Sequence, residues 1–304
     1  MRFHRICAIV AIMLWGAPLQ AEEIKIPHDG VTLNAELTRA ARRTLADGVV
    51  LIVHGTLSHN RMETIRNLST VLVERGLTTL AINLSLGVND RHGPYDCKIA
   101  HRHRYMDAVR EIGAWLDWLQ ARGARNVTLM GHSRGGAQAA RMAADAGAAG
   151  KSHPLVRRVA LLAPGTWSAG AAARTFERRH GRPLAPDMEK ARALIAAGNG
   201  AHLMPRPGLL SCTIAGVTAD SFVSYYAPDP RFDTPSILKD IAVPTLVIAG
   251  GEDNVVKGLA EKVRPQADGK RLRFALIDDA NHFFLDLFAE DVADLVEELL
   301  GASS

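Results

Sequence analysis

The chain has 304 residues, 47% of them hydrophobic, so it is long enough for one large domain with an insertion and too apolar for wholesale disorder. Its formal net charge is +4, and it falls to +2 without residues 1–21, which carry Arg2 and Arg5 and no acidic residue. A charge balance this close to neutral gives no reason to expect nucleic acid as a partner.

The first 21 residues are typical of a secretory signal peptide. A basic start is followed by an apolar run, Ile6 to Trp15, that is too short to span a bilayer, and then by a cleavage region that ends at Ala21. We therefore expect a mature chain that begins at residue 22 and is periplasmic or secreted; an uncleaved membrane anchor is the alternative. No later segment offers about 20 uninterrupted apolar residues, so no membrane-spanning helix is expected.

The first part of the mature chain alternates strand-like and helix-like segments. The expected elements are strands at 23–26 and 31–37, a strand at 48–53, a helix from a cap at Ser58 to Arg75, a strand at 77–82 and a helix at 101–122. The first two strands flank a His-Asp-Gly turn and predict an antiparallel start to a sheet. Residues 83–100 form an unusually long connection, and connections of that length are often functional.

The second part continues the alternation with one interruption. The expected elements are strands at 127–130, 156–163, 245–249 and 272–277 and helices at 136–149, 257–263 and 285–300. Residues 166–240 contain helical stretches among Pro- and Gly-rich pieces and predict an inserted cap or lid. The expected fold class is therefore α/β, a mostly parallel central sheet with helices on both faces, formed by residues 22–165 and 241–304.

A Gly-x-Ser-x-Gly motif, Gly131-His132-Ser133-Arg134-Gly135, lies between a predicted strand and a predicted helix. This setting is that of a nucleophile elbow, a sharp turn that lifts a serine hydroxyl above the sheet. The turn is strained, so we expect larger residues at Gly131 and Gly135 to collide with the serine. Free N–H groups at the start of the helix favour a developing negative charge, and Ser133 is the predicted nucleophile.

Two further polar residues follow predicted strands, at the edge where parallel sheets place their sites. Asp253 follows the strand at 245–249 and His282 follows the strand at 272–277. A histidine can accept the serine proton, and a carboxylate can orient the histidine. We predict His282 as the base and Asp253 as the orienting acid. The rival acids are Glu252, Asp278 and Asp279.

An oxyanion hole is expected beside Ser133. The backbone N–H of Arg134, the residue after the nucleophile, is one predicted donor. The other is the N–H of Thr56, which follows the strand at 48–53, with Leu57 as the alternative. His54 in the same segment is a rival for the role of base.

His-Gly after one strand, Gly-His-Ser-Arg-Gly, Gly-Gly-Glu-Asp and Ala-Asn-His-Phe-Phe together resemble the α/β-hydrolase superfamily over residues 45 to 300. The Gly-His-Ser-x-Gly form is similar to that of lipases, esterases and thioesterases. Haloalkane dehalogenases and epoxide hydrolases differ, because they carry an aspartate nucleophile where this chain has Ser133. The resemblance implies a structural role for His54 and a mechanism, but it does not specify a substrate.

We expect a serine hydrolase that cleaves a small-molecule acyl ester or thioester through an acyl-enzyme, with no cofactor and no metal. An acyltransferase with the same triad and a non-catalytic binding protein on the same fold are the alternatives. Cys97 and Cys212, the two cysteines left after removal of the signal peptide, predict a disulfide in an exported protein, with two buried free thiols as the alternative.

Two weaker patterns remain. His101-Arg102-His103-Arg104 is expected to be a solvated helix start, with an acidic-substrate or metal site as the alternative. The cap carries large apolar residues, some of which are expected to line a pocket and the others to form the core of the cap. They are Trp167, Phe176, Met188, Met204, Phe222, Tyr225 and Tyr226.

Overall fold

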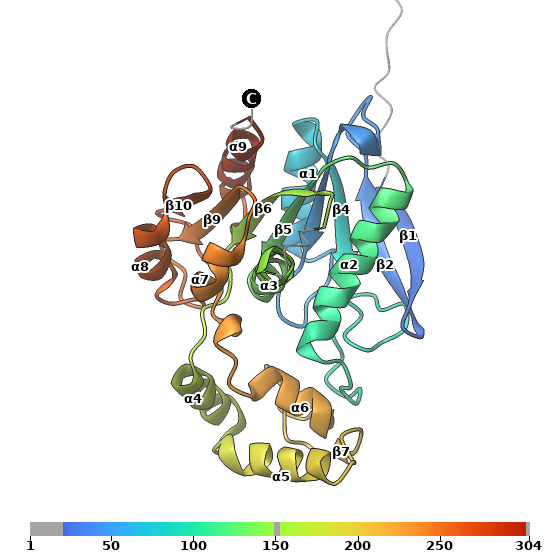
Figure 1. Ribbon diagram of the computed structural model, residues 1–304, viewed down its shortest axis with the longest axis vertical. Helices are drawn as coiled ribbons and strands as arrows, with labels where there is room; N and C mark the ends of the chain where they lie inside the picture. Colours follow the sequence, from blue (N-terminus) through green and yellow to red (C-terminus); the bar gives the residue numbers. More distant parts are fainter. Residues whose placement is uncertain (1–20, 149–152, 302–304) are drawn as a thin grey trace, which may run out of the picture.

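A computed structural model describes residues 21–148 and 153–301, so the predicted signal peptide lies outside the described residues except for Ala21. Eight strands form one sheet in the order β1-β2-β4-β3-β5-β6-β9-β10 (Figure 1). Their bounds are β1 Ala21–His28, β2 Val31–Thr38, β3 Val49–Val53, β4 Thr78–Asn83, β5 Val127–His132, β6 Val156–Leu162, β9 Thr245–Gly250 and β10 Leu272–Ile277. β1 and β2 pair antiparallel and β2 pairs antiparallel with β4, whereas all pairs from β4 to β10 are parallel.

Helices cover both faces of the sheet (Figure 1). One face carries α1 (Glu63–Glu74) and α9 (Phe288–Gly301), and the other carries α2 (Tyr105–Ala121), α3 (Arg134–Ala148) and α8 (Leu259–Val263). Alternate residues of β3 point to opposite faces, so Leu51 packs towards α2 and α3 while Ile52 packs towards α1 and α9. Burial on both faces explains the uninterrupted apolar run of this strand and confirms the predicted fold class.

The first and larger part of the segment between β6 and β9 forms a separate layer below the sheet in Figure 1. It contains α4 (Ala169–His180), α5 (Ala185–Ala196), β7 (Leu203–Met204), β8 (Val217–Thr218) and α6 (Ala219–Tyr226). Phe176, Phe222 and Tyr226 pack ring against ring at centroid distances of 4.9–6.0 Å and form its core. We call residues 166–228 the cap.

The chain then returns to the core through three short helical turns. They are η2 (Pro230–Phe232), α7 (Thr234–Ile237) and η3 (Leu238–Asp240), and all three contact α3. Two more short turns, η1 (Leu45–Asp47) and η4 (Arg264–Gln266), lie elsewhere in the core. Within residues 21–148 and 153–301, none of the helices has both the length and the apolar character needed to cross a membrane.

Several helices begin later than the sequence predicts, because their expected first turns are held in other conformations. The helix expected to start from a cap at Ser58 begins at Glu63, and the Ser58 hydroxyl contacts Met62 Sδ instead. The helix expected from residue 285 begins at Phe288, because Phe284 and Asp286 have positive φ angles that a right-handed helix does not tolerate.

The expectation of a solvated helix start at residues 101–104 is wrong. α2 begins at Tyr105, and both His101 and His103 are buried. The His101 N–H donates to the Gly216 carbonyl oxygen at 2.8 Å, and the His101 carbonyl oxygen accepts from the Thr218 N–H at 3.0 Å. These bonds hold the segment extended against β8, so it joins the core to the cap.

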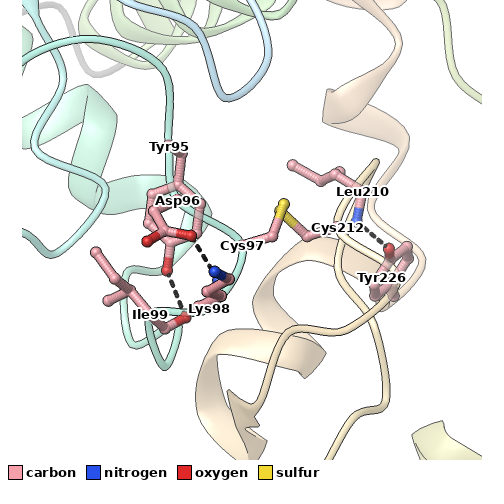
Figure 2. Close-up of a disulfide and its surroundings, with 8 residues drawn as sticks. All are labelled: Tyr95, Asp96, Cys97, Lys98, Ile99, Leu210, Cys212 and Tyr226. Atoms are coloured by element: carbon pink, nitrogen blue, oxygen red, sulfur yellow. Dashed lines mark hydrogen bonds between the residues drawn. A yellow bond between two sulfur atoms is a disulfide. The ribbon is translucent and has the colours of Figure 1, made fainter.

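Cys97 and Cys212 form the predicted disulfide, with their Cα atoms 5.2 Å apart. Figure 2 shows that the bond links the loop after β4 to the cap. It lies next to the paired segments of His101 and β8, and the Ser221 hydroxyl donates to the His103 carbonyl oxygen at 2.7 Å. One side of the cap is therefore attached to the core by covalent and backbone contacts together.

Replacing both cysteines, Cys97→Ala and Cys212→Ala, should lower the free energy of unfolding by about 4 kcal/mol, because the bond closes a loop of 115 residues in the unfolded chain. Urea denaturation of the oxidised protein and the variant measures this difference. Wild-type protein kept in reductant is the control and should unfold like the variant. Alkylation of two thiols in oxidised, unfolded protein would contradict the assignment.

Candidate active site

Ser133 occupies the turn between β5 and α3 in a left-handed conformation, with φ of 56°. Its N–H donates to the Leu162 carbonyl oxygen of β6 at 2.9 Å, and its carbonyl oxygen accepts from the Ala137 N–H of α3 at 3.1 Å. The turn is thus joined to a strand on one side and a helix on the other. These bonds hold a strained residue in place, as a nucleophile elbow requires.

The glycines of the motif are required by close backbone packing; the predicted collision of larger residues with the serine is wrong, because the nearest atoms belong to other backbone segments. A Cβ at Gly131 would lie 2.5 Å from the Gly135 carbonyl oxygen. A Cβ at Gly135 would overlap the His54 carbonyl oxygen and lie 2.6 Å from that of Val53. The helix start therefore lies directly against the end of β3, and this contact places the segment after β3 beside the serine.

The structure brings the three residues of the predicted triad into one hydrogen-bonded chain. His282 Nε2 lies 2.9 Å from Ser133 Oγ, and His282 Nδ1 lies 2.8 Å from Asp253 Oδ2. An ionised carboxylate only accepts, so Nδ1–H donates to Asp253 and Nε2 accepts from the serine hydroxyl. The His282 side chain is 5% exposed and that of Asp253 is 4% exposed, so the hydrogen bond between them is shielded from water.

The carboxylate of Asp253 is held in its ionised form. Burial tends to raise the pKa of Asp253, but the hydrogen bond with His282 and those from the Val256 and Val255 N–H groups outweigh it and lower the pKa below its ordinary value. The rival acids Glu252, Asp278 and Asp279 are exposed, and none forms a hydrogen bond with His282.

Two tightly packed loops bring Asp253 and His282 together. A Cβ at Gly250 or Gly251 would overlap the carbonyl oxygen of Ala280 or Asp278, respectively. The Glu252 N–H also donates to the Ala280 carbonyl oxygen at 3.0 Å. The paired glycines before Asp253 therefore allow the loop after β9 to lie backbone to backbone with the loop after β10.

His132 is a positioning residue that the sequence analysis did not single out. Its Nε2–H donates to the His282 carbonyl oxygen at 2.8 Å, so the residue before the nucleophile holds the loop of the histidine. Burial lowers the pKa of His132 to about 4. His132 therefore stays neutral at physiological pH and does not compete for the proton of Ser133.

The predicted oxyanion donors lie on adjacent segments. Gly55 is so close that a Cβ there would lie 3.3 Å from Ser133 Cβ. The Arg134 side chain joins the two segments by donating from Nε to Thr56 Oγ1 at 3.1 Å. Within the described part of the chain, the backbone N–H groups of Thr56, Leu57 and Arg134 have no hydrogen-bond acceptor, so Thr56 and Leu57 both remain candidates.

His54, the rival base, has both ring nitrogens occupied elsewhere. Its Nδ1–H donates to the Gly55 carbonyl oxygen at 2.9 Å, and its Nε2 lies 3.1 Å from both the Leu84 N–H nitrogen and Arg91 Nη2. Burial and the charge of Arg91 lower the pKa of His54 to about 3. His54 is thus a neutral structural side chain that shapes the segment of Thr56.

A cleft of about 910 Å³ opens over Ser133 and His282, between the core and the cap. Trp167, Phe176, Tyr225 and Tyr226 line it, as expected for some of the large cap residues. Met188, Met204 and Phe222 do not line it and are buried inside the cap. The cap therefore covers the cleft, and Ser133 and His282 form its floor.

The described residues contain one group with the spacing of metal ligands, Glu23, Asp90 and His92. It lies at the start of the sheet, where Lys25 Nζ is 3.6 Å from Glu23 Oε2 and also pairs with Asp90. The lysine ammonium already supplies a cation to these carboxylates, so the group is an ion-pair cluster.

Residues 49–296 match the alpha/beta hydrolase family, and the chain belongs to that family. This match confirms the resemblance noted in the sequence and the hydrolase class that it implies. No curated protein matches the sequence.

Solved structures share the fold at low sequence identity. Est1E from Butyrivibrio proteoclasticus is 18% identical with a TM-score of 0.65, over 92% of this chain and 99% of that one. An esterase from Pyrococcus furiosus is 16% identical with a TM-score of 0.60, over 93% and 91%. Dienelactone hydrolase from Anabaena variabilis is 22% identical with a TM-score of 0.55, over 94% and 98%.

Gly135→Ala should destabilise the protein by about 3 kcal/mol, because the added methyl group meets the backbone oxygens of His54 and Val53, which cannot rotate away. Gly113→Ala is the matched control: Gly113 lies within α2 with no atom within 4 Å of an added Cβ, and this change should stabilise by about 0.5–1 kcal/mol. Thermal and urea unfolding of both variants measure the difference. Equal stabilities would show that the elbow tolerates a Cβ.

Proposed function

We propose that this protein is an exported serine hydrolase that cleaves an ester or thioester of a small molecule through an acyl-enzyme. The observation that carries the proposal is the buried chain of hydrogen bonds from Ser133 through His282 to Asp253. Membership of the alpha/beta hydrolase family supports the class of reaction.

In the first half of the reaction, Ser133 Oγ attacks the acyl carbon of the substrate. His282 Nε2 accepts the hydroxyl proton as the C–O bond forms, and the ionised Asp253 stabilises the resulting imidazolium. The bond from the acyl carbon to the leaving oxygen or sulfur then breaks. His282 gives the proton to the leaving group, which departs as an alcohol or thiol, and the acyl group remains on Ser133.

In the second half, water attacks the acyl-enzyme and transfers a proton to His282. The ester bond to Ser133 breaks, the carboxylic acid leaves and the serine regains its proton from His282. Both halves pass through an oxyanion, and we assign its stabilisation to the backbone N–H groups of Arg134 and of Thr56, or Leu57 in its place, which have no acceptor within the described residues. These free donors cost no rearrangement of the backbone at the moment of reaction.

Ser133→Ala and His282→Ala should each lower kcat for a short activated ester by about 10⁴-fold or more, because each removes a member of the proton-transfer chain. Asp253→Asn should cost less, because serine and histidine retain partial function together. Asp279→Asn is the control, an exposed carboxylate in the histidine loop that should leave the rate unchanged. Steady-state kinetics with p-nitrophenyl acetate measure all four.

Labelling with a fluorophosphonate and peptide mapping identifies the nucleophile directly, and the label should fall on Ser133. Near-normal turnover by folded Ser133→Ala protein would exclude the proposed mechanism. If Asp253→Asn left kcat unchanged and Asp279→Asn lowered it severely, the orienting acid would be Asp279.

Export is proposed from the basic, apolar and small-residue progression of residues 1–21. The disulfide between Cys97 and Cys212 supports it, because such bonds persist in oxidising compartments. The mature protein should begin at or near Glu22 and lie in the periplasm or the medium. Intact mass of the fractionated protein measures this, and retention of Met1 to Ala21 would indicate a membrane anchor instead.

A further inference from the structure

The cleft over Ser133 is lined by charges of one sign. Five cationic side chains line it, and none of its lining residues is an aspartate or glutamate. The five are Arg134, Arg174, Arg178, Arg179 and Lys257. We propose that the substrate is an anionic ester, one that carries a carboxylate or phosphate group in addition to the scissile bond. This inference rests on the proposed hydrolase function and specifies the class of its substrate.

Within the described residues these five cations have no carboxylate partner, in contrast to several other arginines of the same protein. None of the five forms a salt bridge within the described residues. By contrast, Arg182, just beyond α4, pairs with Asp187, and Arg141 of α3 pairs with Asp145 at 2.7 Å. Cations without a carboxylate partner also lie elsewhere on the described surface, Lys190 and Arg192 of α5 among them, but these five line one cleft whose lining holds no carboxylate, and a bound anion would be their partner there.

The cap supplies three of the cations from a single helix. Arg174, Arg178 and Arg179 belong to α4 and line the cleft, whereas the one acidic residue of that helix, Glu177, does not. Arg174 and Arg178 are four residues apart, and like charges at this spacing destabilise a helix. An anionic ligand would relieve that repulsion, and guanidinium groups bind carboxylate and phosphate oxygens in pairs.

The core supplies the cation next to the nucleophile. Arg134 follows Ser133, its Nε is bonded to Thr56, and its guanidinium lies 5.9 Å from the centre of the Tyr225 ring. Its two terminal nitrogens have no hydrogen-bond partner in the described part of the chain. Arg134 and the arginines of α4 therefore face the same cleft from the core and from the cap.

The side chains around these cations indicate the rest of the ligand. Trp167, Phe176 and Tyr105 line the same cleft, so an apolar or aromatic body can pack there while its anionic group is held by the arginines. Asp253 lies behind His282 and is hydrogen-bonded to it, so the carboxylate of the triad does not line the cleft. A cleft lined by one sign of charge raises the local concentration of ligands of the opposite sign.

Matched ester pairs test the proposal. Mono-p-nitrophenyl glutarate against p-nitrophenyl pentanoate places the anion on the acyl side, and 4-acetoxybenzoate against 4-acetoxybenzamide places it on the alcohol side. 4-Acetoxyphenyl phosphate against 4-acetoxyanisole replaces the carboxylate by a phosphate. After correction for alkaline hydrolysis rates, at least one anionic ester should exceed its neutral partner in kcat/KM on the order of tenfold. The pair that shows the preference identifies the anion and its side.

Variants locate the preference in the cleft. The double variant Arg174→Gln, Arg178→Gln should bring the ratio of anionic to neutral kcat/KM close to one. Lys190→Gln with Arg192→Gln is the matched control, because it removes the same charge from exposed positions of α5 that do not line the cleft. High salt should also reduce the wild-type ratio, since screening shortens the range of exposed charges.

The outcomes separate this inference from the proposed function. If Ser133 is required for turnover but every neutral ester matches or exceeds its anionic partner, the inference is wrong and the hydrolase function stands. Equal loss of the ratio in the cleft and control variants would also overturn it, because the overall charge of the cap would then be responsible. If no ester is turned over in a Ser133-dependent way, the proposed function itself fails.

Discussion

The active site depends on one steric constraint, the contact of backbone with backbone at the start of α3. Gly135 lies against the carbonyl oxygens that end β3, and Gly131 lies against Gly135. This contact holds Ser133 in a left-handed conformation beside Gly55. Ser133 and the segment that holds Thr56 are thereby positioned by the same packing, which leaves no room for a Cβ at Gly131 or Gly135.

The second requirement is that the buried titratable side chains around Ser133 keep defined charge states. Burial keeps His54 and His132 neutral, with pKa values of about 3 and 4, and both act as positioning groups. Asp253 remains ionised, because hydrogen bonds to its oxygens outweigh the effect of burial. One anion therefore faces one histidine, and the proton of Ser133 has a single acceptor of suitable geometry.

The core carries Ser133, His282 and Asp253, and the cap covers the cleft above Ser133. All three triad residues follow strands of the sheet, which is a rigid scaffold. The cap brings α4 over the cleft and is attached on its other side through the disulfide and the extended segment at His101. In the proposed reaction the rigid core would position the reacting groups, while the cap side chains that line the cleft would select the substrate.

The sequence by itself determined the alternation of strands and helices, because strands that are buried on both faces are continuously apolar. It predicted the elbow, Asp253 and His282, because each follows a strand. It also predicted the disulfide pair by elimination. Only the tertiary structure decided what depends on contacts between distant segments: the bond from His132 to the loop of His282, burial of His101 and His103 against the cap, and convergence of Arg134 with the arginines of α4. The periodicity of apolar residues indicates which face of a helix or strand is buried in the core. It does not indicate which distant residue a side chain will contact, because that depends on how the loops pack.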